Sequence, residues 1–177
     1  MLYPLSYGGS GCRESLAQRL ERRTSRTAVA EAATILQDRG VSPRILVVDD
    51  TESIRRLIRL NLELEGFDVV EAADGQECLE AARALRPDLV TIDVVMPQLD
   101  GFAAAAALRA NPLTASLPIV IVTTQAQPAD RRRGQEIGVD AYVTKPFHPD
   151  ALVATVREVL ARAAAKGGDS GADTLDR

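Results

Sequence analysis

Five side chains that can do chemistry stand at the ends of apolar runs in this chain. Asp49 and Asp50 close the first run, Asp93 closes the third, and Thr123 and Lys145 close the fourth and fifth. Carboxylates gathered in one place repel one another and raise each other's affinity for protons, so such a cluster favours a bound cation. Oxygen ligands without Cys or His select a hard ion, and a site with few carboxylates suits Mg²⁺, with Mn²⁺ as the alternative.

Asp93 is the candidate for the reactive group. It directly follows the apolar residues 89–92 and stands four residues before Pro97. A single aspartate at such a position is more often a turn former or a helix cap than a nucleophile, and the cluster as a whole has a solvated set of caps as its simpler explanation. The case for chemistry therefore depends on whether the other four side chains converge on Asp93.

The apolar runs have the pattern of strands in a parallel sheet. Residues 89–96 lie between two prolines and do not alternate between apolar and polar types, which is typical of a strand buried on both faces. Such runs alternate with amphipathic stretches, which predicts helices on both faces of the sheet. In such a sheet ligands bind at the carboxyl ends of the strands. The strands are expected at residues 44–48, 69–72, 89–92, 118–123 and 141–144.

Five helices are expected between and after these strands. Thr51 or Ser53 is expected to cap the first, which Gly66 ends. Its core-facing stripe is expected to comprise Ile54, Leu57, Ile58, Asn61 and Leu62. The next helices are expected from Asp74–Gly75 to Pro87, over 102–109 and over 128–136. The last is expected to bury Leu152, Val153, Val156, Val159 and Leu160 on one face.

The strand and helix pattern divides the chain into three parts. Residues 1–43 form an N-terminal extension with six arginines against four acidic residues, a charge of +2, and we expect it to be partly helical or disordered. Residues 44–164 form the α/β domain, and the polar residues 165–177 are expected to be a disordered tail. So short a tail holds no effector domain, which favours a domain that acts alone by binding other proteins.

Composition and charge exclude several classes of protein. The net charge of −4 and the pI near 5.1 argue against nucleic acid as the main partner. No apolar run approaches the roughly 20 residues of a membrane span, and the start of the chain lacks the features of a secretory signal. We therefore expect a cytoplasmic protein without membrane association. Cys12 and Cys78 have no metal-ligand spacing and are expected to be thiols without a role.

The order of these residues, with residues 96–101 (MPQLDG) after the third acid and residues 145–147 (KPF) after the fifth strand, closely resembles the receiver domain of two-component response regulators. The resemblance covers about residues 44–163, and the stand-alone chemotaxis response regulator is the type that it suggests. It implies a flavodoxin-like, doubly wound (βα)₅ sandwich with a five-stranded parallel sheet of order 2-1-3-4-5. It also implies a cis peptide bond between Lys145 and Pro146.

The resemblance further implies a role for each site residue. Asp93 matches the aspartate that accepts a phosphoryl group from a phosphohistidine with Mg²⁺. The other roles are direct Mg²⁺ ligand for Asp50, Mg²⁺ ligand through water for Asp49, third ligand for the backbone carbonyl of Val95, phosphoryl contact for Thr123, pairing cation for Lys145 and switch aromatic for Tyr142. An added phosphate is expected to draw Thr123 and Lys145 inward, so that Tyr142 moves in from a more exposed rotamer.

The resemblance also names partners. It implies a sensor histidine kinase or a histidine phosphotransfer protein as phosphodonor and an unknown downstream target protein. We expect no direct DNA binding, and a monomer or a phosphorylation-dependent dimer. The chain is expected to be a phosphoacceptor that assists its own modification rather than an enzyme. Val95 cannot orient a hydrolytic water whereas Gln125 can, so moderately slow loss of phosphate is expected.

Three rival functions are weighed at this point. A nucleotide-binding fold is one, but residues 48–52 (VDDTE) offer no glycines to cradle phosphates. A haloacid-dehalogenase-like phosphatase also uses an aspartyl nucleophile, but it needs a second acid where Val95 stands, and it does not account for Lys145. A protein-docking module that works without phosphorylation is the third rival, although every reactive position is filled.

Two surface features have a bland and a functional interpretation of similar weight. Leu60 and Leu64 lie off the core stripe of the first helix and are either incidental or a docking patch for a kinase or phosphotransfer protein. The arginines at 131–133 are either a solvated face or part of a dimer face. His148 is expected to be a surface loop residue.

Overall fold

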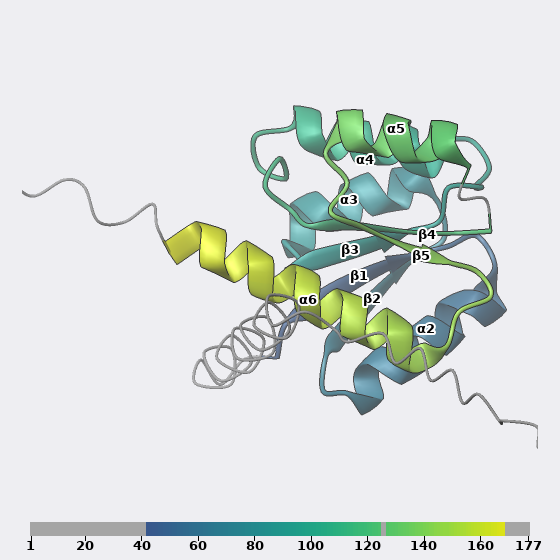
Figure 1. Ribbon diagram of the computed structural model, residues 1–177, viewed down its shortest axis with the longest axis vertical. Helices are drawn as coiled ribbons and strands as arrows, with labels where there is room; N and C mark the ends of the chain where they lie inside the picture. The colour runs from purple at the N-terminus through teal and green to yellow at the C-terminus, as the bar shows by residue number, and fades with distance from the viewer. Residues whose placement is uncertain (1–41, 125–126, 169–177) are drawn as a thin grey trace, which may run out of the picture.

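The computed structural model describes residues 42–124 and 127–168 (Figure 1). The N-terminal extension up to residue 41, Gln125 and the tail from residue 169 lie outside the described residues, so the expectations about them stay predictions. Apart from residues 125 and 126, the structure describes the whole of the α/β domain expected at 44–164.

Five parallel strands form one sheet in the order β2-β1-β3-β4-β5. They are β1 (Arg44–Val48), β2 (Asp68–Ala72), β3 (Leu89–Ile92), β4 (Ile119–Thr123) and β5 (Ala141–Thr144). This confirms the expected strands and their order. The strand that precedes the candidate Asp93 lies in the middle, between β1 and β4.

Helices cover both faces of the sheet, in two layers that Figure 1 shows clearly. They are α2 (Glu52–Leu64), α3 (Gly75–Leu85), α4 (Gly101–Ala110), α5 (Pro128–Ile137) and α6 (Pro149–Gly168). The helices α2 and α6 lie on one face, and α3, α4 and α5 lie on the other. The flavodoxin-like sandwich of alternating strands and helices is therefore confirmed.

Aspartate caps begin two of these helices. The carboxylate of Asp74 accepts a hydrogen bond from the Glu77 N–H at 2.8 Å, and that of Asp100 accepts one from the Ala103 N–H at 2.7 Å. Each satisfies a backbone donor that the first turn leaves open. Thr51 is the N-cap residue of α2, as one of the two expected candidates, but its side chain makes no capping hydrogen bond.

Two apolar layers form the core, one on each side of the sheet. Ile45 and Val47 of β1 pack in the layer under α2 and α6, while Leu46 and Val48 pack under the other three helices. Successive side chains of a strand point to opposite faces, and both faces are covered here. This explains why the sequence runs are apolar throughout instead of alternating.

Two details differ from the sequence-based expectation. Leu57, which was expected on the core stripe of α2, is 43% exposed, whereas Ile58 and Leu62 are fully buried. The last helix buries all five expected residues but runs on to Gly168, so residues 165–168, which were expected in the tail, are helical.

A test of the core concerns Thr91. Its side chain is 1% exposed, and its hydroxyl has no hydrogen-bond partner among the described residues. Burying a hydroxyl without a partner costs free energy, so Thr91→Val should raise the free energy of unfolding by about 1 kcal/mol in urea titration. Thr91→Ser keeps the hydroxyl and removes a buried methyl group, so this variant should lower the free energy of unfolding by about 1 kcal/mol. A less stable Thr91→Val variant would contradict this account.

Candidate functional site

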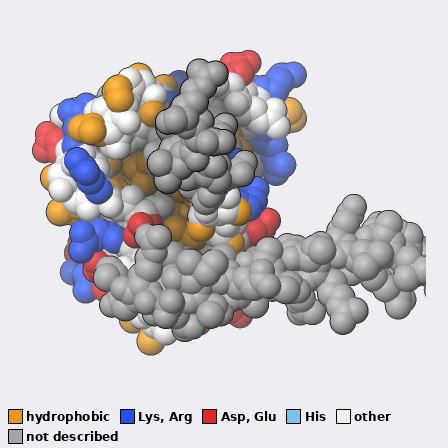
Figure 2. All heavy atoms as spheres, turned by 90° about the vertical axis from the view of Figure 1, so that its left-hand side faces the viewer, with side chains coloured by type: hydrophobic (Ala, Val, Ile, Leu, Met, Phe, Trp, Pro, Cys, Tyr) orange, Lys and Arg blue, Asp and Glu red, His pale blue; other side chains and the backbone are white. Residues whose placement is uncertain are grey.

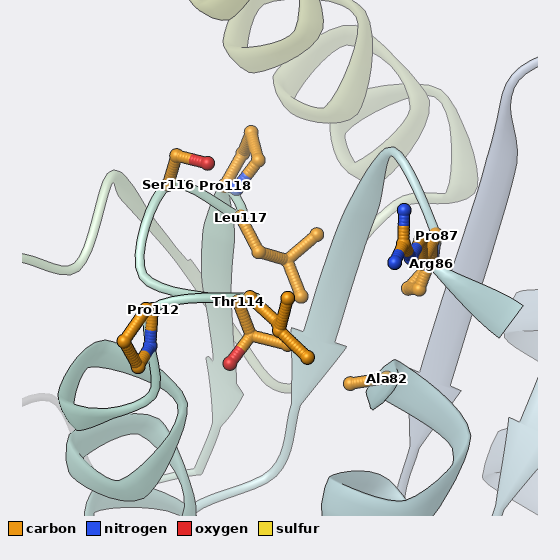
Figure 3. A pocket seen from close by; sticks show the side chains of 9 residues that line it. Ala82, Arg86, Pro87, Pro112, Thr114, Ser116, Leu117 and Pro118 are labelled. Carbon is orange, nitrogen blue, oxygen red and sulfur yellow. The ribbon is translucent and has the colours of Figure 1, made fainter. Parts of the chain in front are cut away.

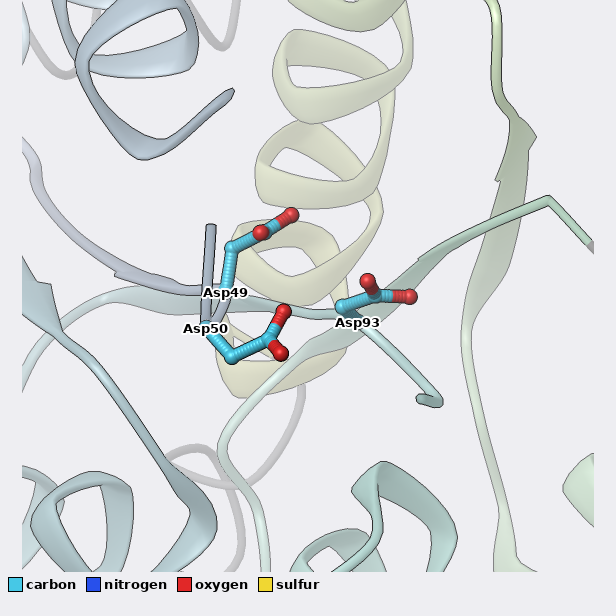
Figure 4. Close-up of side chains that lie close together, drawn as sticks. All are labelled: Asp49, Asp50 and Asp93. Atoms are coloured by element: carbon cyan, nitrogen blue, oxygen red, sulfur yellow. The ribbon is translucent and has the colours of Figure 1, made fainter. Parts of the chain in front are cut away.

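Three aspartates meet at the carboxyl edge of the sheet. One oxygen from each of Asp49, Asp50 and Asp93 lies within 4.8 Å of the others (Figure 4). Asp49 and Asp93 are buried, with 1% and 7% exposure, while Asp50 is exposed at the rim. The convergence predicted from the sequence is therefore present, and a solvated set of helix caps does not describe two buried carboxylates.

The sheet itself places these carboxylates. The Asp93 N–H donates to the Val48 carbonyl at 2.9 Å, which extends the β1–β3 pairing by one residue past β3. The loop after Asp93 is held close by Gly101, where a Cβ would lie 2.1 Å from the Asp93 carbonyl oxygen. Neighbouring strands and a tight loop therefore fix where the Asp93 backbone lies.

Lys145 connects two of the three acids. Its Nζ donates to Asp49 Oδ2 at 2.5 Å and to Asp93 Oδ2 at 2.7 Å. The Lys145 N–H donates to the Thr123 carbonyl at 2.8 Å, so the ends of β4 and β5 direct the lysine to the acids. The peptide bond between Lys145 and Pro146 is cis, as the resemblance implied.

The acids keep the lysine charged. Burial by itself lowers the pKa of the Lys145 amine, but its hydrogen bonds to Asp49 and Asp93 and their negative charges outweigh burial, and the pKa is raised above 10.5. A permanent cation therefore stands between the two buried carboxylates.

Both carboxylate oxygens of Asp49 accept a hydrogen bond from the protein. Its Oδ1 accepts from the Thr51 N–H at 2.9 Å, and its Oδ2 faces Lys145. The Arg55 side chain donates to the Asp49 carbonyl oxygen at 2.7 Å and ties the first turn of α2 to the acidic turn. Sequence reasoning missed Arg55, although its place four residues after the Thr51 cap puts it on the turn that follows the acids.

Two other expected residues lie close by. The Val95 N–H donates to Asp93 Oδ1 at 3.4 Å, while its side chain is exposed. Thr123 is buried at the end of β4. The main chain at Val95 therefore lies beside Asp93, as is required if the Val95 carbonyl is to bind the same metal ion as Asp93.

Tyr142 is half-buried rather than exposed. Its hydroxyl donates to the Asp130 carbonyl at 3.3 Å, and a Cβ on Gly134 would lie 1.5 Å from this hydroxyl. Burial raises the pKa of Tyr142, Asp130 adds to this and Arg131 opposes it. In this structure the ring therefore already lies against α5, not in the more exposed rotamer expected from the sequence.

A separate hollow lies at the opposite, amino-terminal edge of the sheet. Figure 2 views this edge and shows apolar side chains there. Figure 3 shows the pocket from close by, and its volume is about 350 Å³. Its lining includes Pro87, Pro112, Leu117 and Pro118, with Arg86 at its side. None of the five candidate residues lines it, so it is not part of the acidic site.

Comparison with known families decides how the site is interpreted. The family described as the response regulator receiver domain matches residues 45–157, which is more than half of the chain. The chain belongs to this family. Receiver domains take part in two-component signalling as phosphoacceptors, and they interact with histidine kinases and bind Mg²⁺ at an acidic cluster. The phosphatase rival is therefore set aside.

Curated relatives cover the same part of the chain. The alkaline phosphatase synthesis transcriptional regulatory protein PhoP of Bacillus subtilis is 43% identical over 122 residues, which are 69% of this chain and 50% of that protein. The DNA-binding dual master transcriptional regulator RpaA of Synechocystis is 40% identical over 120 residues, 68% of this chain and 50% of that protein. The chain thus spans about half the length of these relatives.

Solved structures of similar size share the fold. The chemotaxis protein CheY4 of Vibrio cholerae is 34% identical, with a TM-score of 0.65 over 67% of this chain and 99% of that chain. A CheY-like receiver domain protein of Methanospirillum hungatei is 28% identical, with a TM-score of 0.68 over 72% of this chain and 100% of that chain. These likenesses confirm the predicted family and fold class. Within the described residues, none of the helices is both long and apolar enough to span a membrane.

The charge arrangement at Lys145 can be tested by titration. A raised pKa in the folded state means that the stabilisation from its two ion pairs is complete below pH 10.5 and is lost as the pH rises through the folded-state pKa. Nuclear magnetic resonance of labelled lysine side chains measures this pKa, and the exposed Lys166 gives a reference signal. Asp93→Asn should lower the pKa of Lys145. Titration of wild-type Lys145 below pH 10.5 would contradict the arrangement.

Proposed function

We propose that Asp93 is the phosphoacceptor of this receiver domain and that residues 44–164 are its functional unit. One observation carries the proposal. Asp93 is buried at the end of the central strand β3, with two more carboxylates within 4.8 Å and the Lys145 ammonium at 2.7 Å. A nucleophile, a cation and oxygen ligands for a metal ion therefore stand at one edge of the sheet.

The transfer step follows from this placement. A carboxylate oxygen of Asp93 attacks phosphorus in line with the P–N bond of a phosphohistidine. The new O–P bond forms as the P–N bond breaks, and the imidazole nitrogen keeps the electron pair. Lys145 then moves from Asp93 Oδ2 to the phosphoryl oxygens, which carry more negative charge. The chain thereby assists its own modification rather than acting as an enzyme on other substrates.

The acidic cluster fits Mg²⁺, with Mn²⁺ as the alternative, because it offers only hard oxygen ligands. When bound, the ion supplies positive charge to the oxygens of the phosphoryl group. We assign direct binding to Asp50, Asp93 and the Val95 carbonyl. We assign binding through water to Asp49, as the resemblance implies.

The partners follow from this role. The phosphodonor is a sensor histidine kinase or a histidine phosphotransfer protein in the cytoplasm, and the output is a phosphorylation-dependent contact of a monomer or dimer with a target protein. The relatives that the chain matches are named as transcriptional regulators, and the chain spans half of them. The absence of direct DNA binding therefore stays a prediction, and so does slow phosphate loss, because Gln125 lies outside the described residues.

Labelling with acetyl phosphate tests the phosphoacceptor. The full chain should incorporate phosphate in the presence of Mg²⁺, and Asp93→Asn should incorporate none. Lys145→Met should slow labelling on the order of 10²-fold, because it removes a preorganised charge from the transition state.

The matched control for this experiment is Asp88→Asn. Asp88 directly precedes β3, at its other end, and its exposed side chain accepts a hydrogen bond from the Arg44 N–H. The asparagine keeps an acceptor oxygen, so this variant should label like wild type. Equal labelling of the wild type and Asp93→Asn would remove the proposal.

Thr123 and Tyr142 are the proposed switch. The phosphoryl group draws Thr123 towards itself. Tyr142 then shifts, and because its ring already packs against α5, the shift changes the contact with this helix. The helix α5 is the element best suited to respond, because Gly134 is its single fully buried residue. Because α5 is held by little buried packing, a small shift of Tyr142 is enough to move this helix.

Gly134→Ala tests where Tyr142 lies. Alanine favours the helix, and its methyl group takes the place of the tyrosine hydroxyl, so the ring should move outward and its raised pKa should fall towards 10. Nuclear magnetic resonance of labelled tyrosine measures the pKa, and Tyr142→Phe assigns the signal. Gln135→Ala on the exposed side of α5 should leave it unchanged. An unchanged pKa in Gly134→Ala would contradict this position of the ring.

A further inference from the structure

The three carboxylates of the acidic site are held in different ways. Asp49 and Asp93 are buried and share the Lys145 ammonium, whereas Asp50 is exposed and forms no ion pair among the described residues. The Oδ1 of Asp50 accepts a hydrogen bond from the Thr51 hydroxyl at 3.2 Å, which is exposed to solvent. The position of the Asp50 carboxylate therefore depends mainly on how the backbone beneath it is held.

The ladder of the sheet fixes this backbone only as far as Asp49. The Val48 carbonyl accepts from the Asp93 N–H at 2.9 Å, and the Asp49 N–H donates to the Ala72 carbonyl at 3.3 Å. These bonds hold the chain to β3 on one side and to β2 on the other. Asp50 lies past the last paired residue of β1, so the peptide group between Asp49 and Asp50 is beyond the reach of the ladder.

Arg55 supplies a bond at the point where the ladder ends. Its guanidinium reaches back over the first turn of α2 and donates to the Asp49 carbonyl at 2.7 Å. This carbonyl belongs to the same planar peptide group as the Asp50 nitrogen, so holding it fixes the rotation of that group. On the other side of Asp50, the Thr51 N–H donates to Asp49 Oδ1 at 2.9 Å. Asp50 is thus held between two hydrogen bonds, one of which comes from a charged donor.

Arg55 holds this backbone without pairing with a carboxylate. Its neighbour Arg56 pairs with Glu52 at 2.7 Å, but Arg55 forms no ion pair within the part of the chain that the structure describes. A guanidinium placed on the Asp50 carboxylate would compete with a metal ion for its oxygens. On the Asp49 carbonyl it leaves that carboxylate accessible to a cation while the peptide group stays fixed.

We propose that Arg55 is a positioning residue for metal binding, because it holds the peptide group that aims the Asp50 carboxylate at the same point as Asp93. The inference rests on the proposed function, which assigns Asp50 to Mg²⁺. Removing a group that orients a metal ligand commonly lowers metal affinity by roughly 10- to 100-fold. The positive charge of Arg55 acts in the opposite direction, but at the solvated rim in about 0.15 M salt this repulsion changes affinity only about twofold. The positioning effect therefore decides the sign.

Titration of the full chain with magnesium chloride tests the assignment. Nuclear magnetic resonance of the Asp50 and Thr51 amides gives the dissociation constant for Mg²⁺. Arg55→Met keeps an apolar stem and a good helix former but removes the donors, and we expect it to weaken binding about tenfold. Arg55→Lys keeps the charge and a donor, so its dissociation constant should lie closer to that of the wild type. Binding by Arg55→Met as tight as by the wild type would overturn the inference.

Arg56→Met is the matched control. Arg56 is the next residue of α2, and its side chain is 73% exposed in the ion pair with Glu52. This variant removes the same charge but no bond to the acidic turn, so it should bind Mg²⁺ as tightly as the wild type or up to about twofold more tightly. Equal weakening in Arg55→Met and Arg56→Met would show an effect of charge or helix stability and would also overturn the inference.

A measurement without metal separates positioning from general support of the fold. Backbone amide relaxation should show the order parameter at Asp50 falling from about 0.85 towards about 0.6 in Arg55→Met and unchanged in Arg56→Met. A loss of stability in urea with the order parameter and the Mg²⁺ affinity unchanged would make Arg55 a structural residue only and overturn the inference, while the proposed function would stand. Failure of the wild type to bind Mg²⁺ would remove the metal assignment of Asp50 and this inference with it.

Discussion

The contact of Lys145 with Asp49 and Asp93 is the interaction on which the site depends. Two buried carboxylates side by side are unfavourable, since each loses water and faces the charge of the other. The ammonium supplies the missing positive charge, and the acids in turn hold its pKa above 10.5. A phosphoryl group on Asp93 would change this balance at once, because it adds charge on the side where Lys145 already points. The same interaction therefore stabilises the resting site and prepares the response that we propose.

The sheet makes this contact from parts that are far apart in the chain. Asp49 follows β1, Asp93 follows β3, and Lys145 follows β5, and the sequence separation of Asp49 and Lys145 is 96. Parallel strands place all their carboxyl ends at one edge, and neighbouring ladders hold the register there. The order β2-β1-β3-β4-β5 brings β1 and β3 together, and Lys145 reaches back past β4 to join them. A long lysine side chain is suited to that span.

Most of this arrangement could be predicted from the sequence, for reasons that particular residues make plain. Apolar runs such as residues 89–92 mark doubly buried strands, and the acids and the lysine stand directly after them. Leu57 was misplaced because the core stripe of α2 is narrow and a helical pattern alone does not show where it ends. Arg55 was missed because its contact is with a backbone carbonyl, which sequence does not display. The position of Tyr142 depends on the absence of a side chain at Gly134, a relation between two elements that no local pattern contains.

The two faces of the sheet have different packing, and this bears on where a signal can travel. On one face α2 and α6 bury a continuous apolar layer, which resists local change. On the other face α5 buries Gly134 fully and Ile137 in part, and its arginines at 131–133 are exposed. An element with few buried contacts opens or shifts at lower free energy than its neighbours. Tyr142 lies between α5 and the core beside Phe102, so the switch that we propose for Thr123 and Tyr142 would act on this weakly packed helix. The switch that we propose at this face would therefore act on the side of the sheet opposite to α2 and α6.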